Sequence, residues 1–220
     1  MGAAAAKLVA AFHSLQVPPE FEPTRPLLWT WLERMMEEIE ESASADALPV
    51  SVQVLRGEVD RMAAAVRDDA AGAARMLRVV LAHGDLKPTN VMLVSQEPEV
   101  ELTLIDFELS GPNYRGFDLM KLFRTSPETY CEERFVAFIA QYCQAAGLGE
   151  TAVHELEAET KVFEPLTWLE AAVFFALVIV KGGDTPENVA LLTDRWEKYQ
   201  AKKWMVDHYL RILGRHRTWK

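Results

Sequence analysis

The segment 83–90, with the sequence HGDLKPTN, constrains the fold more than any other part of this chain. A short β-branched and apolar run at 78–82 leads into it, and two further apolar runs follow, at 91–94 and 102–105. Two such runs separated by a polar loop predict the strands of a β-hairpin. The sequence therefore predicts a polar loop followed directly by a hairpin.

Three polar residues are expected to meet in this arrangement. Asp85 and Asn90 lie five positions apart on a tight loop, so both side chains can face one point, and the hairpin returns Asp106 beside them. Taken singly, these are common turn and strand-end residues. Phosphoryl transfer from a nucleotide needs a carboxylate that accepts the proton of the attacking hydroxyl and oxygen ligands that hold Mg²⁺. The spacing predicts one site with those groups.

Helices are predicted on both sides of this segment, because apolar residues recur there at spacings of three and four. The expected helices span 3–15, 27–41, 52–66, 118–123, 132–146, 151–162, 165–180 and 186–213. Strand character is concentrated around the loop and hairpin. The expected fold class is therefore α+β and predominantly helical.

Composition limits the classes of partner. Half of the 220 residues are hydrophobic, so one substantial core and a single unit over residues 1–220 are expected. The formal net charge of −10 argues against binding to nucleic acid or to anionic lipid.

Cys131 and Cys143 form no disulfide framework or metal-binding pattern, which favours a reducing compartment. The longest apolar run, 171–180, is too short to span a bilayer, so no membrane insertion and a cytoplasmic location are predicted.

The loop resembles the catalytic loop of the protein-kinase-like fold. The resemblance implies that Asp85 is the catalytic base, that Asn90 and Asp106 are Mg²⁺ ligands, and that ATP is the co-substrate. Lys87 is expected to share in catalysis by neutralising charge on the transferred phosphate. A histidine at the position of His83 usually braces the loop in this fold, so a supporting role is favoured over that of a second base.

Glu108 narrows the resemblance, because it follows Asp106 by two residues. The same Asp-x-Glu spacing occurs in the aminoglycoside and choline kinase families, whereas protein kinases carry Asp-Phe-Gly. Together with the string 113–118, NYRGFD, it resembles the signature of choline/ethanolamine kinases. The fold implied is a protein-kinase-like C-terminal lobe whose small hairpin carries the catalytic and metal-binding loops. Glu108, Arg115 and Asp118 are expected to support the site structurally.

The resemblance also implies a pocket for a small cationic amino alcohol, ethanolamine or choline, which aromatic faces can hold by cation–π attraction. Asp85 would contact its hydroxyl, and Tyr130 and Phe174 fall where the family places pocket aromatics. The chain departs from the family at 121–125, KLFRT, where Thr125 replaces a pocket glutamate and two positive charges are added. A tryptophan-rich string is likewise replaced by EAAVF at 170–174.

The largest departure concerns the N-terminal lobe that covers the nucleotide in this family. The segment 3–15 matches the helix that follows the hinge between the lobes, and no glycine-rich strand-turn-strand or lysine-bearing strand precedes it. The leading expectation is therefore a phosphotransferase lobe, and whether it is active without an N-lobe is left open. Two alternatives stay open, an inactive scaffold that binds a partner kinase subunit and a small-molecule kinase of the aminoglycoside type. Whether the chain forms a homodimer is also left open.

Overall fold

The computed structural model describes residues 2–22, 25–68, 76–126 and 131–215, and the chain divides into two units. Unit 1 comprises Met1–Leu27 and Met76–Lys161, and unit 2 comprises Leu28–Arg75 and Val162–Lys220. Each unit is thus assembled from two separate stretches of sequence. The prediction of a single lobe over residues 1–220 stays a prediction.

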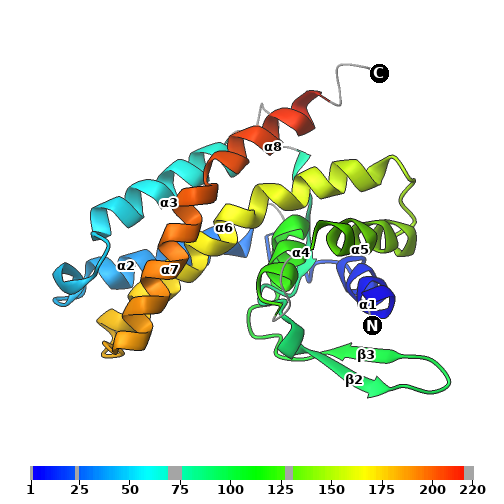
Figure 1. Ribbon diagram of the computed structural model, residues 1–220, viewed down its shortest axis with the longest axis horizontal. Coiled ribbons are helices and arrows are strands. Elements are labelled where there is room, and N and C mark those ends of the chain that lie inside the picture. Colours follow the sequence, from blue (N-terminus) through cyan, green and yellow to red (C-terminus); the bar gives the residue numbers. More distant parts are fainter. Residues whose placement is uncertain (1, 23–24, 69–75, 127–130, 216–220) are drawn as a thin grey trace. The chain divides into compact units, whose positions relative to one another are not determined.

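Unit 1 contains two small antiparallel sheets of two strands each (Figure 1). In the first, β1 (Val79–Ala82) pairs with β4 (Gly111–Tyr114). In the second, β2 (Val91–Ser95) pairs with β3 (Glu101–Leu104), with a register shift near the end of β2. The second sheet is the predicted hairpin, and it directly follows the polar loop.

Three helices and the first part of a fourth surround these strands in unit 1. The alanine-rich α1 (Gly2–His13) packs against α5 (Glu132–Ala145) and also contacts β1 and β3. Its small side chains let the helix backbone approach its neighbours closely, and Ala6 and Ala10 are buried. The helix α4 (Arg115–Arg124) follows β4 without a loop and packs on both strands of the first sheet. The strand β1, which leads into the polar loop, therefore contacts both α1 and α4.

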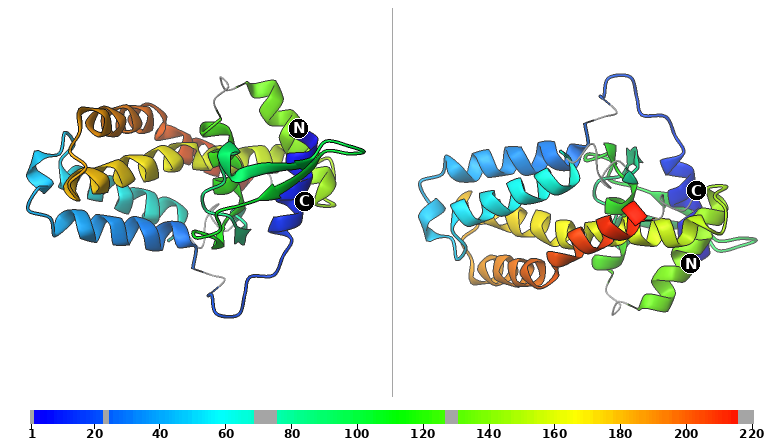
Figure 2. Two further views of the ribbon diagram at one scale, coloured as in Figure 1. Left: turned by 90° about the horizontal axis from the view of Figure 1, so that it is seen from below. Right: turned by 90° about the horizontal axis from the view of Figure 1, so that it is seen from above.

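Unit 2 is built from helices. It contains α2 (Leu27–Glu40) apart from its first residue, α3 (Val52–Val66), α7 (Pro186–Lys202), α8 (Trp204–Arg215) and the rest of α6 (Ala152–Val180). Figure 2 shows these helices running alongside one another. Salt bridges from Arg56 of α3 to Glu33 and Glu40 link α3 to α2. Their apolar faces form the core, with Leu28, Met36, Leu55 and Met62 fully buried.

The helix starts follow from local chemistry. Ser51 caps α3, where its hydroxyl accepts a hydrogen bond from the Val54 amide, and Thr185 caps α7 in the same way through Asn188. Pro186 occupies the first turn of α7, where its missing N–H has no helical partner to lose. The predicted span of α3 is confirmed.

Several predicted boundaries were wrong. Helices were expected at 151–162 and 165–180, but α6 runs unbroken through Pro165. A proline inside a helix costs about 3 kcal/mol, and the full burial of Phe163, Leu166 and Leu169 offsets that cost. The single helix expected at 186–213 is divided at Lys203 into α7 and α8. The strand β4 was not expected, and α4 begins at Arg115 rather than at 118.

The helix α6 is long and apolar enough to cross a membrane by length and composition. However, 61% of its most apolar window is buried inside the protein. That burial is typical of a core helix, which gains its stability from packing against neighbouring helices rather than against lipid.

Candidate active site

The predicted catalytic loop begins where β1 ends. Gly84 has a φ of 80°, a left-handed conformation that residues with a Cβ rarely adopt. This turn is followed by Leu86, which is fully buried, and by a short 3-10 turn at Pro88–Asn90. Because Leu86 is held in the core, the polar residues on either side of it are held at the edge of unit 1.

A buried carboxylate on α4 holds the start of the loop. Asp118 is fully buried, and it accepts hydrogen bonds from the backbone amides of His83, at 2.6 Å, and Gly84, at 2.9 Å. The Nε2 atom of His13 in α1 lies 3.2 Å from the same carboxylate, and its Nδ1 atom lies 3.0 Å from the hydroxyl of Tyr142 in α5. Asp118 therefore connects the loop to α1 and, through His13, to α5.

Asp85 lies one residue further along and is partly buried. The Nζ atom of Lys87 lies 2.6 Å from its Oδ2 atom, and the Nζ atom of Lys121 lies 3.1 Å from its Oδ1 atom. Burial raises the pKa of the Asp85 carboxyl, but the two ammonium groups outweigh it, so the pKa falls below its ordinary value. Asp85 is thus an ionised carboxylate with a lysine on each oxygen.

Asn90 is buried at the end of the same loop. Its amide nitrogen donates to the backbone carbonyl of Asp85 at 3.0 Å. Since the nitrogen is used in this way, the amide oxygen is the atom that Asn90 can offer to a cation, and an oxygen is what Mg²⁺ prefers.

The hairpin returns Asp106 to this loop. The amide of Ile105 donates to the carbonyl of Asn90 at 3.1 Å, and the carbonyl of Ile105 lies 2.9 Å from Nε2 of His83. Asp106 follows in a left-handed conformation, with a φ of 69°, and both it and Glu108 are exposed. The hydrogen bond to Asp85 raises the pKa of Lys87, and the charges of Asp106 and Glu108 act in the same direction.

The structure therefore brings Asp85, Lys87, Asn90 and Asp106 to one edge of unit 1. Among the described residues, no three His, Cys, Asp or Glu side chains form a group that could hold a metal ion by themselves. An amide oxygen and one carboxylate nevertheless fit Mg²⁺, which usually takes one or two protein carboxylates and completes its shell with substrate phosphates and water.

Other predicted site residues lie elsewhere. The guanidinium of Arg115 pairs with Glu159 of α6, and both side chains are largely buried, so Arg115 links α4 to α6. Phe174 belongs to unit 2, where it is half-exposed and its ring meets the edge of Phe175. Tyr130 lies outside the described residues.

Sequence reasoning missed two contributors to this site. It noted Lys121 only as an added positive charge, and it did not assign a role to His13. One signal was available for Lys121, because it follows Asp118 by three residues on a helix and so shares a face with it. Nothing in the local sequence places α1 beside α4, so His13 could not be assigned in this way.

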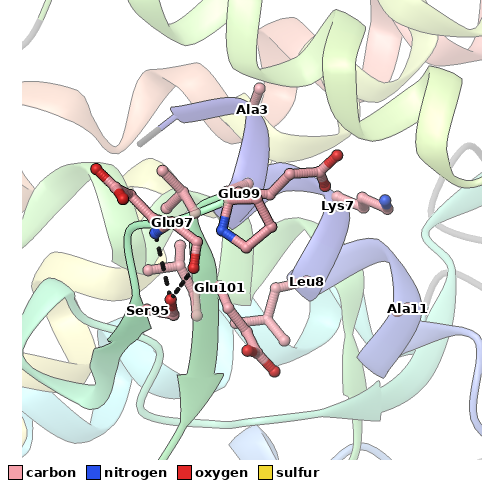
Figure 3. Close-up of a pocket in the computed structure, with 12 residues that line it drawn as sticks. Ala3, Lys7, Leu8, Ala11, Ser95, Glu97, Glu99 and Glu101 are labelled. Atoms are coloured by element: carbon pink, nitrogen blue, oxygen red, sulfur yellow. Dashed lines mark hydrogen bonds between the residues drawn. The ribbon is translucent and has the colours of Figure 1, made fainter.

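A cavity of about 770 Å³ lies between α1 and the end of the β2–β3 hairpin (Figure 3). Leu8 and three alanines line it on the helix side, and Glu97, Glu99 and Glu101 contribute carboxylates from the hairpin. Among the described residues that line it, none belongs to the predicted site. The cavity therefore does not coincide with the cluster around Asp85.

The arrangement of these elements is a protein-kinase-like fold. The fold is similar to those of an ethanolamine kinase from Plasmodium vivax, with a TM-score of 0.74 and 18% identity, and a choline kinase from Cryptosporidium parvum, with 0.73 and 18%. These matches cover 93% and 95% of this chain, and 60% and 66% of the respective structures. An aminoglycoside phosphotransferase, APH(2'')-Ib, is more distant, with a TM-score of 0.56, 12% identity, and coverage of 93% and 64%.

The family is shown by sequence. The family model for choline/ethanolamine kinase matches residues 1–179, and the chain belongs to that family. The human choline/ethanolamine kinase is 25% identical over 70% of this chain and 42% of its own length. A probable ethanolamine kinase of Arabidopsis thaliana is 30% identical over 57% of this chain and 36% of its own. The chain thus spans less than half the length of these relatives.

Proposed function

We propose that this chain transfers the terminal phosphate of ATP to the hydroxyl of a small primary alcohol, with ethanolamine and choline as the candidates that its family supports. The observation that carries the proposal is the position of Asp85. It is an ionised carboxylate on a braced loop, with Lys87, Asn90 and the hairpin residue Asp106 around it. This is the set of groups that phosphoryl transfer needs.

In the proposed reaction, the substrate hydroxyl donates a hydrogen bond to Oδ2 of Asp85. Its oxygen forms a bond to the terminal phosphorus of ATP while the bond from that phosphorus to the bridging oxygen of ADP breaks. The hydroxyl proton passes to Asp85. Lys87 is the more exposed of the two lysines, so it can leave Oδ2 and neutralise charge on the transferred phosphate.

Asn90 and Asp106 would hold Mg²⁺, which supplies positive charge to the phosphates when it is bound. The remaining assignments are supporting ones. His83 donates its backbone amide to Asp118 and contacts Ile105 through its ring, so it links the loop to the hairpin. Asp118 and Arg115 tie α4 to its neighbours, and Glu108 adds negative charge near Lys87. Tyr130 and Phe174 stay candidates for the pocket of the amino alcohol.

The proposed location is the cytoplasm. Cys131 and Cys143 are both free, which suits a reducing compartment. The burial of α6 supports a core helix rather than a membrane span.

Two measurements test the proposal. Phosphorus NMR of the 220-residue chain with ATP, Mg²⁺ and either alcohol should show the phosphomonoester, and Asp85→Asn should lower the rate at least about 100-fold. Isothermal titration with ATP and Mg²⁺ should give heat that is lost in Asp106→Asn. Glu99→Gln, which removes an exposed charge at the end of the hairpin, is the matched control and should keep it.

The results separate the alternatives. Nucleotide binding without phosphorylation of ethanolamine or choline would overturn the substrate assignment and favour a different alcohol, as in the aminoglycoside type. If the chain neither binds ATP with Mg²⁺ nor forms product, it is not an enzyme by itself. A role in binding a partner kinase subunit would then be the better account.

A further inference from the structure

His13 is a buried histidine whose two ring nitrogens both have polar partners. Its side chain is 2% exposed. The Nε2 atom lies 3.2 Å from Oδ2 of Asp118 in α4, and the Nδ1 atom lies 3.0 Å from the hydroxyl of Tyr142 in α5. Because His13 itself belongs to α1, its ring joins three helices of unit 1 at one point.

The direction of each hydrogen bond follows from these partners. Oδ2 of Asp118 also accepts the backbone amide of His83, and Oδ1 accepts that of Gly84, so both oxygens of the carboxylate are acceptors. Nε2 of His13 must then carry the proton and donate, which leaves Nδ1 of the neutral ring as an acceptor. Burial raises the pKa of the Tyr142 hydroxyl, so it keeps its proton and donates to Nδ1. A chain of hydrogen bonds thus runs from Tyr142 to the loop.

This chain ends at the backbone beside the proposed base. His83 and Gly84 immediately precede Asp85, so a rotation of the Asp118 carboxylate would move their amides and turn the Asp85 side chain. Without a donor at Nε2 of His13, the described contacts leave Oδ2 with a backbone amide alone, and the carboxylate is held less firmly. A displacement of about 1 Å can lower the rate of a reaction about 100-fold.

We propose that His13 is a positioning residue for phosphoryl transfer, which acts through Asp118 on the direction in which Asp85 points. The inference rests on the proposed function. The hydrogen bonds described for the His13 ring go to Asp118 and Tyr142, and neither is a proposed ligand of ATP, Mg²⁺ or the alcohol. Loss of His13 should therefore lower kcat with little change in KM. A histidine that only packs α1 against α5 would change stability alone.

Two substitutions separate donation from packing. Glutamine places its amide nitrogen about where Nε2 lies, so His13→Gln keeps a donor for Asp118, whereas His13→Leu removes it. With ATP, Mg²⁺ and either alcohol, His13→Leu should lower kcat about 10- to 100-fold and change KM less than about twofold, while His13→Gln stays within about threefold of the wild type. His154→Leu, at a histidine whose side chain is 80% exposed on α6 of the same unit, is the matched control and should change neither constant.

Amide hydrogen exchange, followed by NMR, reports on the loop without any reaction. The amides of His83 and Gly84 should exchange at least about tenfold faster in His13→Leu than in the wild type or His13→Gln, because their acceptor is no longer fixed. Amides of the β2–β3 hairpin should keep their rates, which distinguishes a local change from a general loss of stability. If His13→Leu does not fold, His13→Asn replaces it, because the shorter amide stays polar but does not reach the position of Nε2.

The outcomes are distinct. An unchanged kcat in His13→Leu, or an equal loss in His13→Gln, overturns the inference and leaves the proposed function standing. A rise in KM with kcat unchanged does the same, because it would assign His13 to substrate binding. If the wild type forms no product from either alcohol, the proposed function fails and the effect on catalysis fails with it, whereas the exchange rates still show whether His13 holds the loop.

Discussion

Asp118 shows how much one buried residue can organise. Its carboxylate accepts hydrogen bonds from two backbone amides of the loop and contacts His13 of α1, which in turn contacts Tyr142 of α5. Hydrogen bonds to a charged group are about twice as strong as neutral ones. The loop is thus held by its backbone, which leaves the side chain of Asp85 available for chemistry.

The turn at Gly84 gives a prediction at this scale. Gly84→Ala places a Cβ on a residue with a φ of 80°, and we expect a loss of about 1–2 kcal/mol in the free energy of unfolding. Gly57→Ala is the matched control, because Gly57 lies within α3 and a Cβ there meets nothing within 4 Å. It should stabilise the protein by about 0.5–1 kcal/mol. Urea unfolding would measure both, and equal effects would contradict the strained turn.

The residues of the site were predictable to the extent that they are close in sequence. Asp85 and Asn90 share one loop, and the hairpin that returns Asp106 could be read from its apolar runs. Lys121 could not be placed on Asp85, because that contact depends on how α4 packs against β1 and β4. The spacing of residues along the sequence therefore identifies the reacting groups, whereas the charges around them depend on tertiary packing.

At the scale of elements, Glu58 joins α3 to α7. Its carboxylate accepts hydrogen bonds from the Tyr199 hydroxyl, at 2.7 Å, and from Arg61, at 2.8 Å, and it also pairs with Lys203. Burial raises the pKa of Glu58, but these donors outweigh it and lower the pKa to about 2. Tyr199 is itself fully buried, so the interaction lies at the edge of the core of unit 2.

This lowered pKa predicts a pH dependence. A carboxyl with a depressed pKa stabilises the folded state above its ordinary pKa of about 4.5, and the contribution is lost as the pH falls towards about 2. Glu58→Gln should therefore cost about 1–2 kcal/mol at pH 7, after allowance for solvent screening, and almost nothing near pH 2. Urea unfolding at several pH values would show this convergence. Glu197→Gln, exposed on α7, is the control, and a similar loss there would contradict the assignment.

The elements themselves show where local signals are sufficient. The spacing of Leu55, Val59 and Met62 gave α3 correctly, and Ser51 marks its start. The interruption expected at Pro165 did not occur, because burial along α6 outweighs a local preference against helix. The strand β4 contains Gly111 and Pro112, which are poor strand formers, and only its pairing with β1 makes it a strand. These elements depend on contacts that are distant in sequence.

At the scale of the molecule, the two units are interleaved along the chain. Unit 1 needs α1 from the first stretch and the strands, α4 and α5 from the later one. Since α1 packs against α5, β1 and β3, it covers apolar surface that the later stretch cannot cover by itself. A continuous fragment cannot reproduce the unit unless it begins before α1.

A pair of fragments tests this point. We expect residues 76–161 to show no cooperative thermal transition. The free energy of unfolding of a domain is small, and the loss of α1 exposes apolar surface whose burial contributes to that free energy. Residues 1–161 contain all of unit 1 and should melt cooperatively, as followed by circular dichroism. Cooperative melting of the shorter fragment at the same temperature would show that α1 is dispensable.

The interleaving also sets an order for events on the ribosome. The helix α1 is synthesised before its partners β1 and α5, which emerge only after the α2 and α3 segment. Unit 1 can close when residue 161 has left the exit tunnel, with α2 and α3 still awaiting α7 and α8. Their apolar faces are then available to chaperones until α7 and α8 emerge, so aggregation of the nascent unit 2 should depend on the speed of translation.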